Sequence, residues 1–271
     1  MNTKDSEKES QEREFALFRA KEDFDKLSSR LRSEGLWGAV QFLGRKLGSR
    51  RRWWSYYLYH RTFDRSFDRR HGVDTCGVVF LSDLTVVSTN KHSGLEYEPT
   101  PVRAFDRMLG DLPADLSEFA FIDFGCGKGR TLLLASQRHF KMIRGVEFAK
   151  ELQEIAEKNI QAFRSDRQIC RDIRATWIDA AEYEIPDENC VFYFYYPFHE
   201  DVMHKVVGNI LASHEKNPRK MYFVNRLDKP EWHAACERVF GEYESLKRNV
   251  SEKPSFLHSI TAPFTVITYE T

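Results

Sequence analysis

Apolar runs and amphipathic segments alternate along the second half of the chain. Short runs rich in β-branched and aromatic residues predict strands, and longer segments with apolar residues at helical spacing predict helices. The predicted strands are 121–124, 142–148, 175–180, 190–198, 220–225, 243–250 and 260–269, and the predicted helices between them are 128–138, 149–163, 200–213 and 229–239. Strands that alternate with helices predict an α/β protein with a doubly wound, mostly parallel sheet of seven strands.

The most informative segment joins the first predicted strand to the first predicted helix. Asp123 lies near the end of the strand, and Gly125, Gly127 and Gly129 follow at alternate positions. Glycine lets the backbone adopt positive φ and approach a ligand closely, and the start of a helix offers unpaired N–H groups. A strand, a glycine-rich turn and a helix in this order predict a site for a nucleotide-like ligand at the carboxyl end of the sheet.

The details of this turn narrow the choice of ligand. A dinucleotide fingerprint has a third glycine where this chain has Arg130, and a phosphate loop has Ser or Thr after Gly-Lys, where this chain has Gly129 after Lys128. Glu147 follows Gly127 by twenty positions, about where a nucleotide-binding unit places the carboxylate that accepts ribose hydroxyls. Asp179 ends the third predicted strand, where an Asp is also common as a turn residue that bonds its own backbone.

Over residues 97–271 this series of motifs resembles the class I S-adenosylmethionine-dependent methyltransferases, which have a Rossmann-like sheet closed by an antiparallel pair of strands. The resemblance implies S-adenosyl-L-methionine as cofactor, with its ribose on Glu147, its adenine beside Asp179, and its methyl group facing the end of the fourth strand. The cofactor-binding residues that it implies are Tyr97, Thr100, Asp123, Gly125, Cys126, Gly127, Glu147, Phe148, Asp179, Ala180, Tyr196 and Pro197, and the candidate catalytic residues are Tyr195 and Tyr196.

Two of these assignments have an alternative that the residues do not exclude. Tyr97 and Thr100 match a Tyr-x-Pro-Thr element that covers the cofactor in several groups of the family, but the prolines also suit a simple helix entry with Thr100 near the N-cap. Cys126 fits a slot for a small residue inside the turn better than the role of a nucleophile.

The methyl acceptor is not identified by the sequence. Amino-methyltransferases of nucleic acids and of protein glutamine carry Asn/Asp-Pro-Pro-Tyr where this chain has Tyr195-Tyr196-Pro197-Phe198, so that acceptor class is in doubt. A protein lysine and a small molecule remain open, as do nitrogen, oxygen and carbon as the methylated atom. The alternatives to an active enzyme are a catalytically inactive binding protein of the same fold and, less favoured, a nicotinamide-dependent oxidoreductase.

The sequence predicts three parts, a helical and partly flexible N-terminal extension (1–72), a connector that covers the site (73–118) and the cofactor-binding domain (119–271). The extension opens with an amphipathic pattern over 1–34. Residues 44–71 are rich in arginines and aromatics, and their only acids are Asp64 and Asp68. Such a stretch can bind nucleic acid or an anionic membrane, but packing of its aromatics on the domain is favoured, because the formal net charge of the chain is zero.

Composition adds few further constraints. The chain has 271 residues, of which 41% are hydrophobic, enough for one domain with a sizeable core. Its five cysteines have no metal-ligand spacing and their number is odd, so reduced thiols and no metal are expected. The N-terminus is polar and no apolar run reaches the length of a membrane span, so we expect a cytoplasmic protein.

Overall fold

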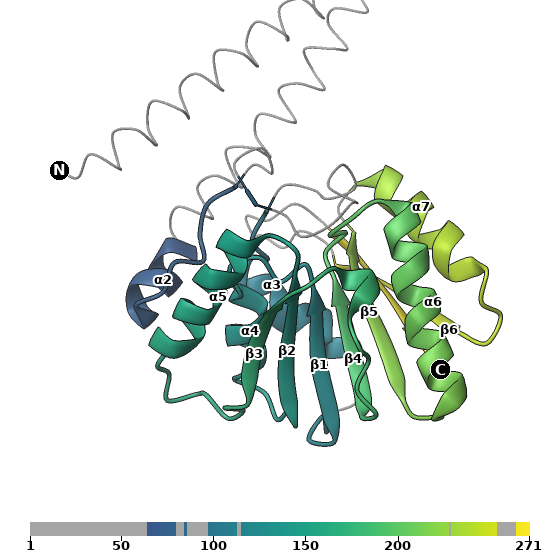
Figure 1. Cartoon of the computed structure of the whole chain (residues 1–271), viewed down its shortest axis with the longest axis horizontal. Helices are drawn as coiled ribbons and strands as arrows, with labels where there is room; N and C mark the ends of the chain where they lie inside the picture. The colour runs from purple at the N-terminus through teal and green to yellow at the C-terminus, as the bar shows by residue number, and fades with distance from the viewer. Residues whose placement is uncertain (1–63, 80–83, 86–96, 113–114, 228, 254–263) are drawn as a thin grey trace, which may run out of the picture. The chain divides into compact units, whose positions relative to one another are not determined.

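The computed structural model describes residues 64–79, 84–85, 97–112, 115–227, 229–253 and 264–271 (Figure 1). All of them belong to one compact unit, Tyr56–Thr271. The predicted amphipathic helix in 1–34, and most of the basic and aromatic stretch 44–71, lie outside the described residues. No helix among the described residues is long and apolar enough to cross a membrane.

A single seven-stranded sheet forms the centre of this unit, in the order β3-β2-β1-β4-β5-β7-β6. The strands are β1 Phe119–Phe124, β2 Met142–Glu147, β3 Ile173–Trp177, β4 Asn189–Phe194, β5 Met221–Leu227, β6 Lys247–Lys253 and β7 Phe264–Glu270. The first five strands are parallel, and β7 is antiparallel to both β5 and β6. The predicted doubly wound, mostly parallel sheet with an antiparallel pair at its end is therefore confirmed.

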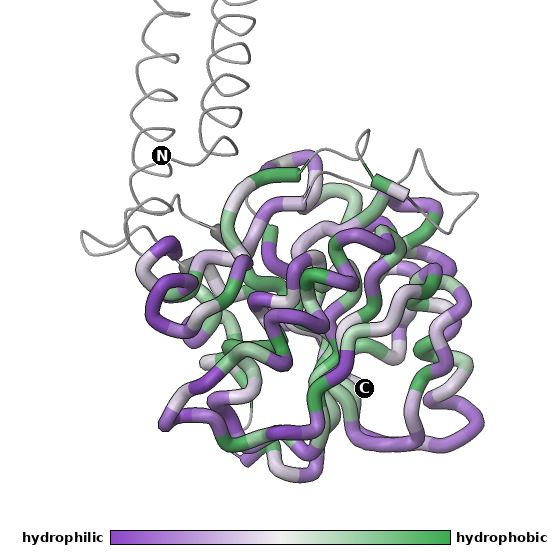
Figure 2. Tube along the Cα trace, turned by 60° about the vertical axis from the view of Figure 1, so that its left-hand side comes forward, coloured by the Kyte–Doolittle hydropathy of each residue, from purple (hydrophilic) through white to green (hydrophobic). Residues whose placement is uncertain are grey.

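Helices cover both faces of the sheet (Figure 1). They are α2 Arg65–His71, α3 Val102–Met108, α4 Arg130–Ala135, α5 Lys150–Ala162, α6 Glu200–Lys216 and α7 Pro230–Gly241, with short 3-10 turns η4 Leu109–Asp111 and η5 Ala180–Glu182. Side chains of α2 to α5 share one buried cluster with the sheet, and those of α6 and α7 share the other. Apolar residues are concentrated along the central strands and hydrophilic residues along the outer helices (Figure 2).

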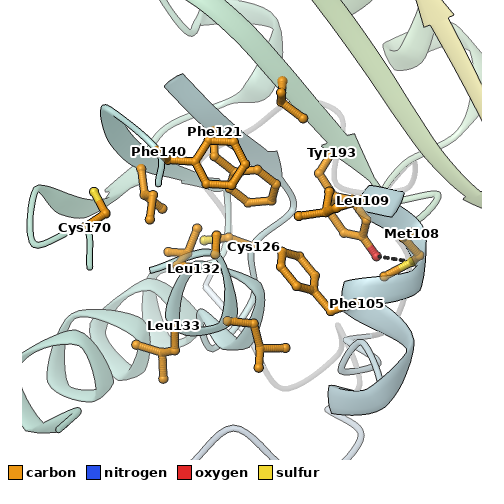
Figure 3. Close-up of a cluster of buried hydrophobic side chains, with 14 of the residues drawn as sticks. Phe105, Met108, Leu109, Phe121, Cys126, Leu132, Leu133, Phe140, Cys170 and Tyr193 are labelled. Atoms are coloured by element: carbon orange, nitrogen blue, oxygen red, sulfur yellow. Dashed lines mark hydrogen bonds between the residues drawn. The ribbon is translucent and has the colours of Figure 1, made fainter. Parts of the chain in front are cut away.

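The cluster beneath α3 and α4 contains several closely packed rings (Figure 3). Phe105 from α3 meets Phe121 of β1 edge to face at 5.8 Å between centroids, and Phe121 also contacts Phe140 at 5.2 Å. The Tyr193 hydroxyl lies 3.7 Å from the Met108 sulfur. Aromatic pairs of this kind add to the free energy gained by burial alone, so they fix α3 firmly on the sheet.

The third, fourth and sixth strands differ most in their limits from the prediction, and the start of the predicted strand 260–269 lies outside the described residues. β3 ends at Trp177, because the side chain of Asp179 accepts a hydrogen bond from the amide of Ala181 and starts the turn η5. β4 ends at Phe194, and β6 begins at Lys247 after a turn in which the amide of Tyr243 donates to the carbonyl of Phe240. Local side-chain and turn hydrogen bonds compete with the ladder at such points.

The exposed edge of the sheet at β3 is covered by two side chains of α5. The Ala175 amide donates to Glu157 Oε1 at 2.8 Å, and Gln153 Nε2 donates to the Ala175 carbonyl at 2.8 Å. An open edge strand is a template for pairing with another chain. Glu157 and Gln153 occupy the central outward-facing groups and thereby oppose such pairing.

Close packing of α4 on the sheet depends on Gly145 of β2. A Cβ atom at Gly145 would lie 2.6 Å from the Cys126 sulfur and 2.7 Å from Leu132 Cδ1. Both neighbours are buried. They can move only by disturbing the core around them.

We predict that Gly145→Ala lowers the free energy of unfolding by about 1–3 kcal/mol, the usual cost of overpacking a core. Gly241→Ala is the matched control, because a Cβ there meets nothing within 4 Å; its stability should stay within about 1 kcal/mol of wild type. Chemical denaturation of both variants measures the difference. Equal stability would mean that α4 can shift on β2 without cost.

Candidate functional site

The glycine-rich turn between β1 and α4 is the centre of the candidate site. Gly125, Gly127 and Gly129 adopt φ of 79°, 54° and 81°, in the left-handed region that favours glycine. The amides of Gly125 and Cys126 both donate to the Val146 carbonyl, at 2.8 and 3.1 Å, which fastens the turn to the end of β2. The three predicted glycines are therefore required by backbone conformation.

Glu147 at the end of β2 contacts the turn directly. Its Oε2 accepts from the Gly127 amide at 2.8 Å and its Oε1 from the Ala149 amide at 2.9 Å. The carboxyl group is buried, and burial raises its pKa to about 7, although the backbone hydrogen bonds act in the opposite direction. A carboxylate has about four lone-pair sites, so these two bonds leave acceptor capacity for ligand hydroxyls.

Asp123 forms a second buried carboxyl group next to Glu147. Burial raises its pKa to about 7, a hydrogen bond from the Thr131 hydroxyl lowers it, and the charge of Glu147 raises it. The two acids thus lie at the carboxyl ends of neighbouring strands, and their negative charges repel each other. Thr131, at the start of α4, was not singled out from the sequence.

Tyr97 and Pro197 pack directly against the turn from two sides. A Cβ on Gly127 would lie 2.1 Å from the Tyr97 ring, and one on Gly125 would lie 2.4 Å from Pro197 Cβ. The Tyr97 hydroxyl donates to the Thr75 carbonyl at 2.8 Å, and the residue forms an isolated β-bridge with Val79. Tyr97 therefore covers the glycine turn in this structure.

Three further predicted cofactor-binding residues follow β2 and β3, among them Asp179, the residue expected beside the adenine. Asp179 caps η5, with Oδ1 accepting from the Ala181 amide at 2.9 Å, and Ala180 is buried behind it. Phe148 is half-buried, and its carbonyl accepts from the Trp177 indole N–H at 3.0 Å. These residues lie at the same end of the sheet as Glu147, as parallel strands require.

Two of the predicted residues turn their side chains into the core. The Thr100 hydroxyl lies 3.0 Å from the Tyr193 hydroxyl, and Thr100 is buried. The Cys126 sulfur packs against Gly145. Any contact of these two residues with a ligand would come from their backbone, and their assignment as cofactor-binding residues stays a prediction.

Arg130, the residue at the third-glycine place, is almost completely buried, with a relative exposure of 1%. Its guanidinium forms ion pairs with Asp64 at 2.8 Å and Asp68 at 3.8 Å, and the charge of Asp64 is the largest of the influences that raise its pKa against the effect of burial. It also donates to the Thr75 hydroxyl at 2.8 Å and lies 3.0 Å from the Cys76 sulfur. Segment 64–76 is thereby held against the start of α4.

A second set of polar contacts holds the same segment. Lys128 Nζ donates to Asp74 Oδ1 at 3.1 Å and to the Cys76 carbonyl at 2.9 Å. Asn159 of α5 accepts from the Asp74 amide and donates to the carbonyls of Asp74 and Lys128, each at 2.8 Å. Phe67 of α2 is buried and stacks on Phe163 at 6.1 Å.

Aromatic side chains gather at the carboxyl ends of β4 and β5. The Tyr196 ring stacks on Trp232 with 4.8 Å between centroids, and the Tyr195 ring meets Trp232 edge to face at 6.2 Å. Arg226 lies 3.8 Å above the Tyr195 ring, and Lys229 Nζ lies 4.1 Å from the Trp232 ring. We call Tyr195, Tyr196, Trp232, Arg226 and Lys229 the aromatic–cation cluster.

Several residues of the site were missed in the sequence, although some left a signal. Asp64 and Asp68 stood out as the only acids in a basic stretch, and Arg130 as a long side chain where close packing favours a small one. A buried charge needs partners, so these three could have been paired. Arg226 and Trp232 gave no such signal, because their contacts span distant segments.

No protein-family model matches the chain, and no curated protein matches it by sequence. Among solved structures, an S-adenosylmethionine-dependent methyltransferase of Leishmania major is similar, with a TM-score of 0.46 and 11% identity, over 62% of this chain and 70% of that one. Magnesium protoporphyrin IX methyltransferase from Synechocystis with bound S-adenosylmethionine gives a TM-score of 0.44 and 10% identity, over 62% and 78%.

An RNA methyltransferase from Salinibacter ruber in complex with S-adenosylhomocysteine gives a TM-score of 0.41 and 18% identity, over 64% and 93%. The described residues contain no group of three or more His, Cys, Asp or Glu side chains that could hold a metal ion.

We predict that stability falls with rising pH because of the two buried acids. The folded pKa values of Glu147 and Asp123 are about 7, against ordinary values of 4.5 and 3.8, so the folded protein holds more protons between these limits. The corresponding stability is present below about pH 4 and is lost as the pH rises through 7. Glu147→Gln should flatten the decrease between pH 5 and 8, measured by denaturation without ligand. The exposed Glu154→Gln should leave the slope unchanged, and parallel curves for all three proteins would contradict the prediction.

We further predict that Arg130→Met destabilises the protein by about 3–5 kcal/mol, because Asp64 would be left as a buried charge without its cation. The double variant Arg130→Met/Asp64→Asn should recover part of this loss. Arg138→Met is the matched control, since Arg138 pairs with Asp106 at the surface and exposed pairs contribute about 0–1 kcal/mol. A loss at Arg130 no larger than at Arg138 would show that the network is dispensable.

Proposed function

We propose that this protein is a methyltransferase that transfers the methyl group of S-adenosyl-L-methionine to an acceptor molecule. The observation that carries the proposal is the contact of the left-handed glycine turn with a buried acid at the end of the neighbouring strand, Gly127 N to Glu147 Oε2 at 2.8 Å. This arrangement suits a ligand with a ribose and without a pyrophosphate. The sheet order, with an antiparallel seventh strand, agrees with this choice.

The residues present fit this cofactor in their chemistry. Glu147 has acceptor capacity for the two ribose hydroxyls, and hydroxyl donors would favour its ionised form. Asp123 and Glu147 together offer negative charge to a cationic ligand at a buried position. Asp179 and Ala180 follow β3, where they would flank the adenine, and Tyr97 would cover the methionine end.

The chain's own residues would act mainly by alignment. When bound, the cofactor supplies a methyl group on a positively charged sulfur. In-line displacement needs the nucleophile, the methyl carbon and the leaving sulfur in one line, and enzymes gain most of the rate by holding them there. Tyr195 and Tyr196 at the end of β4 are the residues that we assign to orienting the acceptor. Tyr97 and Pro197, which close over the glycine turn, would exclude water.

A nicotinamide-dependent oxidoreductase is less well supported. The dinucleotide fingerprint needs a small residue at its third glycine position, and this chain has Arg130 there. Its guanidinium forms ion pairs with Asp64 and Asp68. An inactive protein of the same fold remains the second candidate, because cofactor binding does not by itself imply turnover. Transfer of a radiolabelled methyl group to acceptor fractions separates the active from the inactive protein.

We predict that S-adenosylmethionine and S-adenosylhomocysteine bind in isothermal titration and that Glu147→Ala weakens both about tenfold or more. Hydrogen bonds to a charged group contribute about 1.5–3 kcal/mol each, and the variant loses the acceptor for two hydroxyls. The control Glu154→Ala, on the surface of α5, should bind like the wild type. Binding of NAD in place of these ligands, or unchanged affinity of a folded Glu147→Ala protein, would overturn the proposal.

A further inference from the structure

We propose that the methyl acceptor is a small planar molecule with a negative charge beside its ring, bound by the aromatic–cation cluster at the ends of β4 and β5. This inference rests on the proposed methyl transfer and extends it to the class of acceptor. It chooses between the two acceptors that the sequence left open, a protein lysine and a small molecule. Three observations carry it: stacked half-buried rings, cations on those rings, and a strained backbone at Tyr196.

The rings form a platform that suits a planar ligand. Tyr196 and Trp232 stack with only 13° between their planes, and both are half-buried, so part of each side chain faces solvent. Offset stacking of a further ring on such a pair is a favoured aromatic arrangement. The platform lies at the carboxyl end of β4, beside Pro197, which packs against Gly125 of the glycine turn.

The backbone at Tyr196 indicates that this geometry is held for a purpose beyond packing. Tyr196 has φ of 41°, and among the residues that the structure describes it is the non-glycine residue with positive φ. Such a conformation is costly for a bulky side chain and is concentrated at functional sites. Gly125 lacks a Cβ where Pro197 packs, so the turn that carries Tyr196 is wedged against the glycine turn.

The charges of the cluster favour an anion over an amine. Arg226 and Lys229 already lie on the faces of Tyr195 and Trp232, where a cationic acceptor would otherwise bind. Lys229 is exposed, and it precedes the first turn of α7, whose N-terminal end adds partial positive charge. Arg226 is buried, so it adds positive potential to the cluster, and the exposed Lys229 ammonium is the group that can contact an anion.

The described carboxylates near the cluster are hydrogen-bonded, ion-paired or exposed. Glu98 Oε1 accepts from the Tyr195 hydroxyl at 3.0 Å, and Glu200 forms a two-pronged ion pair with Arg238 at 2.6 and 2.7 Å. Glu231 is exposed in the first turn of α7. Glu98 is thus hydrogen-bonded within the cluster, and the two cations on the rings, Arg226 and Lys229, oppose the ammonium group of a lysine substrate.

For an acceptor that carries a hydroxyl group on its ring, methyl transfer is a substitution at the methyl carbon. An oxygen lone pair forms the new bond to the methyl carbon, and the carbon–sulfur bond breaks with its electron pair going to sulfur, which becomes neutral. The hydroxyl proton leaves to water or to the Tyr195–Glu98 pair, whose hydrogen bond places an acceptor next to the rings. The products are a methyl ether and S-adenosylhomocysteine.

Three probes with the same ring test the charge preference: 4-hydroxybenzoate, 4-hydroxybenzamide and 4-hydroxybenzylamine. Their dissociation constants are measured by titration of the full chain, alone and saturated with S-adenosylhomocysteine. We expect the acid to bind about tenfold or more tightly than the amide, as for one hydrogen bond to a charged group, and the amine to bind weakest. Equal binding of acid and amine, or tighter binding of the amine, would overturn the proposal.

Variants connect this preference to the cluster. Lys229→Gln should reduce the preference for the acid over the amide. The control is Lys220→Gln, which changes an exposed lysine just before the first residue of β5, at the opposite end of the strand from the cluster, and should leave the preference unchanged. Trp232→Leu should weaken all three probes alike. Melting temperature and S-adenosylhomocysteine affinity of each variant verify the fold. An unchanged preference in a folded Lys229→Gln protein would refute the assignment, whereas an intact preference without S-adenosylhomocysteine binding would refute only the proposed methyl transfer.

Discussion

The need to compensate one buried cation organises the region around the glycine turn. Arg130 is the first residue of α4, directly after the glycine turn, and its guanidinium is buried away from water. A buried charge is tolerated only with opposite charge and hydrogen bonds around it. Asp64, Asp68 and the Thr75 hydroxyl supply them, so a segment more than fifty residues earlier in the chain is held at the start of α4.

This anchoring has consequences for the site itself. With 64–76 in place, the Thr75 carbonyl accepts from the Tyr97 hydroxyl, and the Tyr97 ring is held against Gly127. Glu147 contacts the same glycine from the other strand. The cover, the turn and the buried acid therefore form one connected unit, and a change at Arg130 reaches the candidate cofactor site through Thr75 and Tyr97.

The second half of the site depends on a different constraint, the tight approach of Pro197 to Gly125. It sets the path of the chain after β4 and places Tyr195 and Tyr196 beside α7. Because β1 and β4 are parallel neighbours, both halves lie at the carboxyl end of the sheet. A cofactor on the first half and an acceptor on the second would then be adjacent, which is the arrangement that group transfer requires.

The sequence by itself determined the order of strands and helices, the positive-φ glycines and the acids at the ends of β1 and β2. These features are local: periodicity, a glycine at each left-handed position and a carboxylate at a fixed spacing can be recognised without knowing which segments meet. The limits of β3 and β6 were less well predicted, because single hydrogen bonds such as that of Asp179 to Ala181 end a strand.

Only the tertiary structure decided which distant side chains meet. The pairing of Arg130 with Asp64 and Asp68, the burial of Thr100 against Tyr193, and the stacking of Tyr196 on Trp232 all join segments far apart in the chain. Their energies come from desolvation and ring geometry, which depend on the three-dimensional surroundings and leave little periodic trace. The candidate cofactor residues, and Tyr195 and Tyr196 at the end of β4, were therefore predicted from the sequence, whereas their partners Trp232, Arg226 and Lys229 emerged only from the fold.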